Sequence, residues 1–410
     1  NYMKSNYRIA TLDNGMRIGL RHSPDSMVSY IGVAVNAGSR DEKEDCHGLA
    51  HFVEHTIFKG TRSRRSWHIS NRMESIGGEL NAYTSKEETL IYTNAPAGNA
   101  ERAIELLYDI IANSRFPAQE LDKEREVIVE EINSYLDSPA DSIYDEFEEL
   151  IYPDSALAHN ILGTPESVRR LDSADCRGFL DRWYTPANMT AYISDPGDPD
   201  RLIRLMEKYF GRLDFASTPH HRQEPRECEG FDKVVDRDGH QAHTLLGFRV
   251  FGRKDPRRYP LFLLNNYLGG PCMNSRLNQE LREKRGLVYT VDSNVSLLSD
   301  CGTMMIYFGC DRAGSDRCVR LVKKEIERLA ETTLSARSFE ALRNQYCGQL
   351  LVSSDQSESM AMSMAKSLLY YDSIHDISEM TRHIREVTAG EFRSMAEMLA
   401  SSPTARLTIR

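Results

Sequence analysis

The 410-residue chain lacks any apolar run close to the roughly 20 residues that a membrane-spanning helix needs. Its first residues, Asn1–Tyr7, lack the apolar core of a signal peptide, so either the protein has none or it has been removed from this sequence. The net charge of −10 leaves no basic excess for binding nucleic-acid phosphates. We therefore expect a cytoplasmic protein that binds neither membranes nor nucleic acid.

Closely spaced cysteine pairs of the CxxC type are also absent. A zinc site built from cysteines is therefore not expected. The eight cysteines are scattered along a long chain, which is typical of reduced thiols in a reducing compartment rather than of a disulfide framework.

The chain repeats itself at a constant offset. Gly38 and Asp41 recur as Gly252 and Asp255, each 214 positions later, and Thr190–Ser194 recurs at the same offset as Thr404–Thr408. Between these anchors the expected helices and strands follow in the same order. The repeat predicts an internal duplication.

The fold class predicted from this repeat is α+β, with two homologous domains, each an antiparallel β-sheet packed with α-helices. We expect the first domain to span 1–215 and the second 231–410. Residues 216–230 contain two prolines and several charges without an apolar period, which is typical of a linker.

The segment Gly48–Phe58 carries the pattern HxxEH, in which His51 and His55 flank Glu54. Its apolar residues have helical spacing, so the two histidines lie one turn apart on one face. Two imidazoles and a carboxylate suit Zn²⁺, and a carboxylate that is not a ligand is able to move a proton. On these residues alone, a surface helix that carries them by chance is the alternative.

A second predicted helix, Leu121–Ile132, supplies candidates for a third ligand. Glu124 and Glu131 are seven residues apart and so share a face, while Val127, Val129, Ile132 and Leu136 supply the apolar positions. Glu131 would complete the metal site, and Glu124 would hydrogen-bond a ligand histidine. A solvated acidic face is the alternative.

Together these residues resemble the pitrilysin-type zinc peptidases, and within them the mitochondrial processing peptidase branch and its bacterial relatives. The likeness covers Gly48–Thr61, Gly77–Thr84, Glu124–Asn133 and Leu268–Tyr289. It implies a zinc metalloendopeptidase with one Zn²⁺ per chain, bound by His51, His55 and Glu131. The neighbouring Glu130 is rejected as a ligand because it points about 100° away on a helix.

The resemblance also assigns roles in catalysis and substrate binding. Glu54 is the general base and Glu124 the assisting carboxylate. The peptide substrate binds as an added strand along Asn81, Ala82, Tyr83 and Thr84. Arg282 and Tyr289 of the second half reach the substrate, and Tyr289 donates a hydrogen bond to the developing oxyanion. From sequence alone, a plain edge strand and a solvated helix face are the alternatives.

The second half has no HxxEH, so a single zinc site per chain is expected. Two-domain relatives pair with a second chain around a chamber, which implies a homodimer or a heterodimer with a related chain. A second hypothesis is a metal-binding but weakly active or structural subunit of a peptidase-like complex.

Overall fold

The computed structural model describes residues 7–214 and 216–410. The first six residues, part of the stretch that lacks a signal-peptide core, lie outside the described residues. No helix in the described part of the chain combines the length and apolarity needed to cross a membrane. The described residues form two compact units, each containing one β-sheet.

Unit 1 comprises the described residues up to Asn133, together with Asn160–Arg222 and Ser354–Asp376. Its sheet has the order β1-β2-β6-β3-β5-β4, and all neighbouring strands are antiparallel except β2 and β6. The strands are β1 (Tyr7–Thr11), β2 (Arg17–His22), β3 (Val28–Val35), β4 (Glu79–Thr84), β5 (Thr89–Pro96) and β6 (Met189–Asp195). The helices are α1 (Leu49–Thr56), α2 (Ser66–Glu74), α3 (Ala100–Asn113), most of α4 (Ala118–Leu136), α6 (Pro165–Arg170), α7 (Ser173–Trp183), α8 (Pro199–Phe210) and α12 (Ser357–Tyr371), with short 3-10 helices η1 (Ser39–Asp41) and η2 (Pro186–Asn188).

Unit 2 comprises Ser134–His159, Gln223–Ser353 and Ile377–Arg410. Its sheet has the order β7-β11-β8-β10-β9, and here the parallel pair is β7 with β11. The strands are β7 (Phe231–Val235), β8 (Gln241–Phe251), β9 (Val288–Leu297), β10 (Cys301–Asp311) and β11 (Ala405–Ile409). The helices are α5 (Pro139–Ile151), α9 (Arg258–Gly269), α10 (Ser315–Glu331), α11 (Ala336–Ser353), α13 (Ile377–Glu386) and α14 (Ala389–Ser401), with a π-helix η3 (Asn278–Glu283).

The two sheets repeat the same register at the predicted offset. In unit 1, Gly32 lies opposite Tyr192 on one side and Tyr92 on the other. In unit 2, Leu246 lies opposite Arg406 and Ile306, and each of these numbers is 214 higher than its counterpart. The predicted α+β class with two homologous halves is therefore confirmed.

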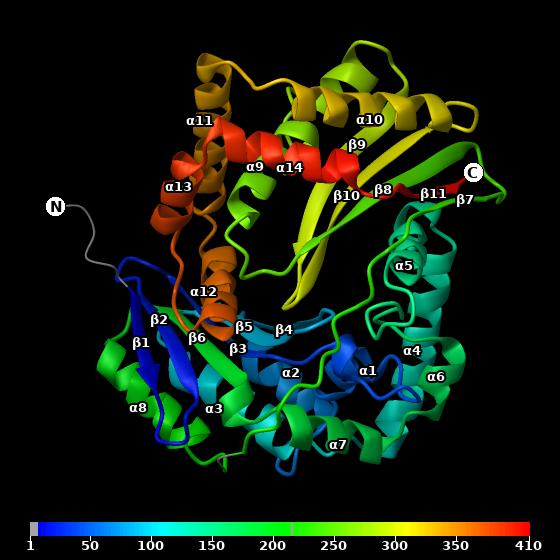
Figure 1. Cartoon of the computed structure of the whole chain (residues 1–410). Helices are drawn as coiled ribbons and strands as arrows, with labels where there is room; N and C mark the ends of the chain where they lie inside the picture. The colour runs from blue at the N-terminus through cyan, green and yellow to red at the C-terminus, as the bar shows by residue number, and fades with distance from the viewer. Residues whose placement is uncertain (1–6, 215) are drawn as a thin grey trace. The chain divides into compact units, whose positions relative to one another are not determined.

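One face of each sheet carries a helix from the other half of the chain. In Figure 1, α12 (orange) lies against β2, β3 and β6, and α5 (teal) lies by β11 (red) and also contacts β8. The compact units are therefore discontinuous, whereas the expected domains 1–215 and 231–410 follow chain order. Segment 216–230 contains no helix or strand, as a linker would.

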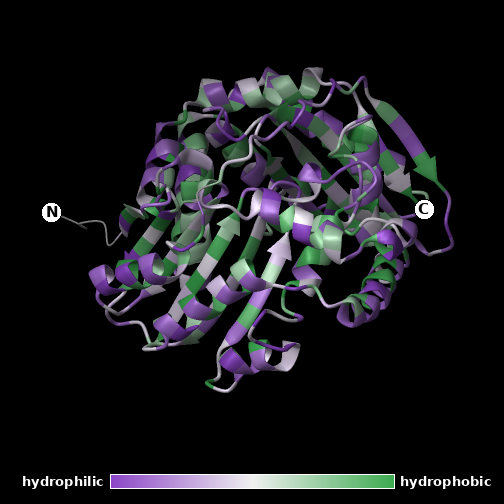
Figure 2. Cartoon of the chain, turned by 90° about the horizontal axis from the view of Figure 1, so that it is seen from below, coloured by the Kyte–Doolittle hydropathy of each residue, from purple (hydrophilic) through white to green (hydrophobic). Residues whose placement is uncertain are grey.

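The amphipathic character of these helices explains why they bind a sheet. The helices carry both green and purple residues in Figure 2, while strands carry much of the green. On α5, Ile143, Phe147 and Ile151 are fully buried against the second sheet. A Cβ on Gly247 would lie 2.2 Å from the Phe147 ring. The ring can pack against β8 only because this residue has no side chain.

Replacing Phe147 by alanine tests whether α5 belongs to the core of unit 2. We expect Phe147→Ala to lower the free energy of unfolding by about 3–5 kcal/mol, because a buried ring leaves a cavity. Urea unfolding followed by circular dichroism measures this change. Glu149→Ala, on the exposed side of the same helix, should change it by less than about 0.5 kcal/mol. A loss below about 1 kcal/mol for Phe147→Ala would show that α5 packs elsewhere.

Candidate metal centre

Helix α1 carries the HxxEH residues and begins at a glycine that no other residue replaces easily. Gly48 has φ +92°, and a Cβ there would lie 2.6 Å from the carbonyl oxygen of Leu162. The helix buries Leu49, Phe52 and Val53 in the core of unit 1. This apolar face fixes the rotation of the helix, and hence the direction of the polar residues between.

The carboxylate of Glu42 holds the first turn of α1. It accepts hydrogen bonds from the backbone N–H groups of Gly48, at 3.0 Å, and Ala50, at 2.7 Å. These are two of the donors that a helix start leaves without intrahelical partners. Sequence reasoning missed Glu42, although an acidic residue close before a helix start is a typical capping signal.

The rings of His51 and His55 lie together on one face of α1. Their centroids are 4.6 Å apart and their planes meet at 64°. His51 is almost fully buried, and its Nδ1 has no hydrogen-bond partner among the described residues. Packing of α1 therefore orients the His51 ring.

Helix α4 presents Glu124 and Glu131 to these imidazoles. A Glu131 oxygen lies 3.7 Å from His51 Nε2 and 3.5 Å from His55 Nε2. Glu124 lies 3.1 Å from His55 Nδ1 and forms an ion pair of 2.7 Å with Lys59, a residue that sequence reasoning did not single out. Glu130 is exposed.

The apolar face of α4 differs from the expected one. Val127 and Leu136 are exposed, and Leu121, Ile128 and Ile132 form the buried face instead. The prediction for Val127 was wrong because Val127 shares the helix face of Glu124 and Glu131, which turns toward the imidazoles rather than the core. Val129 and Ile132 are buried as expected.

The two histidines differ in charge because their surroundings differ. Burial, and then the nearby His55, lower the pKa of His51 to about 4. Burial acts in the same direction on His55, but the contacts with Glu124 and Glu131 outweigh it and raise the pKa of His55 to about 9. The contact with His55 in turn lowers the pKa of Glu131.

The side chains of His51, His55 and Glu131 offer ligand atoms that fit a divalent metal such as zinc. One ligand atom from each of His51, His55 and Glu131 lies within 4.8 Å of the others, and this is the one such group of three among the described residues. Two imidazoles with a carboxylate form a common catalytic zinc set that leaves a position for water. The contact of Glu124 with His55 Nδ1 leaves Nε2 directed to the metal position.

Glu54 lies near two of the candidate metal ligands and near the end of β4. It is close to His55, Glu131 and Thr84, the last residue of β4. Burial raises the pKa of Glu54 above its ordinary value against the opposing effects of Thr84 and His55. A carboxyl group with a raised pKa is suited to taking up and returning a proton near neutral pH.

Strand β4 contains Asn81, Ala82, Tyr83 and Thr84 and pairs with β5 as the last strand of its sheet in the described part of the chain. Leu80 and Ala82 pack against the main core of unit 1, and Tyr83 packs on the opposite side, where α12 lies. The Tyr83 hydroxyl donates to Glu88 at 3.3 Å. Strand β4 is thus hydrogen-bonded to β5 along one edge and packed against other side chains on both faces.

Arg282 and Tyr289 are both exposed on unit 2. Arg282 lies in η3, and the Tyr289 hydroxyl donates a hydrogen bond to Asp311. That carboxylate raises the pKa of Tyr289. At the positions 214 after His51, Glu54 and His55, unit 2 has Asn265, Leu268 and Gly269 in α9, none of which is a histidine or a carboxylate.

Comparison with known proteins gives matches for both halves of the chain. Residues 17–165 match the family described as Insulinase (Peptidase family M16), and residues 170–346 match the Peptidase M16 inactive domain. A protein of Mycobacterium leprae named an uncharacterized zinc protease is 31% identical over 95% of this chain and 88% of its own length. A Bacillus subtilis protein of the same description is 31% identical over 95% of this chain and 94% of its own.

A solved structure shares the fold at lower sequence identity. A protease from Helicobacter pylori superimposes with a TM-score of 0.91 and 19% identity, covering 98% of this chain and 99% of the other.

Exchanging Glu131 for glutamine tests the third ligand. Glu131→Gln should weaken zinc binding by at least about 100-fold, because it removes the charge that faces both imidazoles. Competition with a zinc-chelating dye measures the affinity. Glu130→Gln is the matched control, one residue away and exposed, and should bind zinc like the wild type. Equal affinities of the two variants would exclude Glu131 as a ligand.

The unequal histidines predict how zinc affinity depends on pH. His51 is neutral at pH 7, whereas His55 must lose a proton to bind the metal. Between about pH 6 and about pH 8, each rise of one pH unit should strengthen zinc binding by up to about tenfold. This gain should end as the pH passes about 9, the pKa of His55. Calorimetric titration in buffers of different ionisation enthalpy measures about one proton released per zinc. An affinity independent of pH would contradict this assignment.

Proposed function

The chain belongs to the M16 family of metallopeptidases, and from this premise we propose that it is a zinc endopeptidase acting on peptides or unfolded segments bound as a β-strand. The observation that carries the proposal is the convergence of His51, His55 and Glu131 beside Glu54, next to an edge strand. Each part of that arrangement has a role in hydrolysis.

His51, His55 and Glu131 would hold the metal. When bound, zinc supplies a Lewis acid and lowers the pKa of a water ligand toward about 7. Glu124 keeps the His55 ring in the orientation that presents Nε2, and Lys59 neutralises the outer oxygen of Glu124. The pair therefore preserves the ligand geometry without adding a net charge.

Glu54 is the proton carrier in this proposal. Its carboxylate takes a proton from the attacking water and delivers it to the nitrogen of the leaving amine. The water oxygen bonds to the carbonyl carbon as its proton passes to Glu54; the C–N bond then breaks as Glu54 returns that proton to the nitrogen, so one water is consumed per peptide bond. The raised pKa of Glu54 lets the carboxyl group hold the proton between the two transfers.

The peptide would pair with the open side of β4. Backbone hydrogen bonds to an edge strand bind many sequences, and pockets for alternate side chains select among them. Thr84 beside Glu54 links the end of this strand to the proton carrier. We assign the substrate contacts to Asn81, Ala82, Tyr83 and Thr84.

The family likeness extends the proposal to unit 2 and to a second chain. Arg282 and Tyr289 are assigned to the substrate, and both side chains are exposed on their own unit. Tyr289 would exchange its hydrogen bond with Asp311 for one to the developing oxyanion. Pairing with a second two-domain chain, identical or related, belongs to the same proposal.

Glu54→Gln tests the mechanism directly. The amide is similar in size but does not accept and return a proton, so the cleavage rate should fall by about 10²–10⁴-fold while zinc remains bound. Fluorescence-quenched peptides report cleavage, and metal analysis reports zinc. Glu126→Gln, exposed on α4, should cleave at the wild-type rate. Unchanged cleavage by Glu54→Gln would exclude this mechanism, and zinc-loaded wild type without cleavage would favour a structural subunit.

A further inference from the structure

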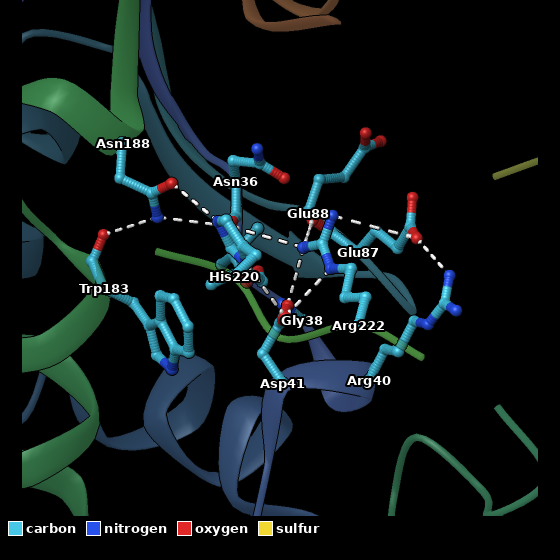
Figure 3. Close-up of polar contacts among 12 residues, drawn as sticks. Asn36, Gly38, Arg40, Asp41, Glu87, Glu88, Trp183, Asn188, His220 and Arg222 are labelled. Carbon is cyan, nitrogen blue, oxygen red and sulfur yellow. Dashed lines mark hydrogen bonds and ion pairs between the residues drawn. The ribbon is translucent and has the colours of Figure 1, made fainter. Parts of the chain in front are cut away.

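The side chains of His220 and Arg222, in segment 216–230, both bind Asp41 of unit 1 (Figure 3). Arg222 donates to both Asp41 oxygens, from Nε at 2.9 Å and from Nη2 at 2.7 Å. His220 Nδ1 lies 3.1 Å from the same carboxylate, and the backbone N–H of Gly38 donates to it at 3.0 Å. Burial alone would raise the pKa of Asp41, but the bonds from His220 and Arg222 outweigh it and lower the pKa. The carboxylate therefore gains more from these partners than it loses by leaving water.

His220 is held from three sides. Its ring stacks on Trp183 with centroids 4.5 Å apart, and its Nε2 lies 2.9 Å from Asn188 Oδ1. The Asn188 amide donates to the carbonyl oxygens of Asn36 and Trp183, which fixes its oxygen toward the ring. Both ring nitrogens thus have a polar partner, and with the stacking on Trp183 these contacts fix the position and orientation of the ring.

Arg222 also reaches the turn between β4 and β5. Its Nη2 donates to the carbonyl oxygen of Glu87 at 3.2 Å, and its Nη1 lies 3.7 Å from the Glu87 carboxylate. That carboxylate forms a buried ion pair of 2.7 Å with Arg40. The backbone N–H of Arg40 donates to the carbonyl oxygen of Lys86 in the same turn. The linker and η1 therefore hold the turn that directly follows Thr84.

The residue after Asp41 is hydrogen-bonded to helix α1, which carries His51, Glu54 and His55. Asp41 is followed by Glu42, whose carboxylate binds the backbone N–H groups of Gly48 and Ala50. Two adjacent acidic residues therefore bind two different segments: Asp41 binds the linker, and Glu42 binds the start of α1. A displacement of one is transmitted to the other through a single peptide bond.

We propose that Arg222, with His220, is a positioning residue for the peptidase reaction: it holds the end of β4 and the start of α1 in the register that brings Thr84 beside Glu54. This inference rests on the proposed function for its consequence in catalysis, but not for the anchoring itself. A bidentate arginine suits the role because its planar fork fixes direction as well as distance.

Hydrogen exchange tests the anchoring without reference to activity. In Arg222→Ala, amides of residues 79–96 and 42–58 should exchange at least about tenfold faster. The matched control is Arg8→Ala, which removes another arginine–aspartate pair of unit 1 whose side chains are 52% and 60% exposed. Its exchange in both segments should equal that of the wild type. Unchanged exchange in Arg222→Ala would overturn the proposal.

Peptide affinity tests the consequence for the site. It is measured by fluorescence anisotropy in zinc-loaded chains that carry Glu54→Gln, so the result does not depend on turnover. Adding Arg222→Ala should weaken binding by about tenfold, because a misplaced strand loses backbone bonds, while bound zinc stays unchanged. Arg222→Lys keeps the positive charge but lacks the planar guanidinium, so its peptide affinity should fall between those of the Arg222 and Arg222→Ala chains. If Arg222→Ala fails to fold, the affinity of Arg222→Lys tests the positioning role instead.

The outcomes separate the two proposals. Faster exchange with unchanged peptide affinity would leave a purely structural anchor and overturn the positioning role. Weakened binding with faster exchange supports it, even if the wild type proves unable to cleave, in which case the proposed function alone fails.

Discussion

The contact of one carboxylate with two imidazoles is the constraint on which unit 1 depends. Glu131 from α4 lies within 3.7 Å of both Nε2 atoms on α1. His51 is almost fully buried, so its imidazole and the two neighbouring polar groups need partners that replace water. A divalent cation satisfies all three at once, whereas protons on His55 do so only in part. The apolar faces of α1 and α4 then keep the groups from separating.

In the proposed function, the surroundings of these three residues divide the chemical tasks. Glu124 and Lys59 orient one histidine, Glu54 has the raised pKa of a proton carrier, and β4 leaves an open strand edge beside it. Unit 2 repeats the sheet in the same register, yet it has Asn265 and Gly269 at the positions of the two histidines. The duplicated fold thus provides one half with the candidate metal ligands and one half with other residues at the two histidine positions.

Sequence reasoning succeeded where local periodicity or constant spacing carried the information. HxxEH with helical apolar residues predicted α1, the seven-residue spacing predicted that Glu124 and Glu131 share a face of α4, and the 214-residue offset predicted the paired sheets. It failed where the answer depended on packing partners. An amphipathic helix shows that it has an apolar face but not which sheet it covers, so the exchange of α5 and α12 was not predicted. Likewise, the polar composition of 216–230 predicted a linker and concealed that the partly buried side chains of His220 and Arg222 bind Asp41.

The central claim is that His51, His55 and Glu131 bind one zinc ion per chain. Anomalous scattering from a crystal of the purified protein, collected on both sides of the zinc absorption edge, tests it most directly. The account predicts a single peak per chain at about 2.0–2.2 Å from His51 Nε2, His55 Nε2 and a Glu131 oxygen. A zinc peak bound by other residues, or none at this position in crystals that contain zinc, would contradict it.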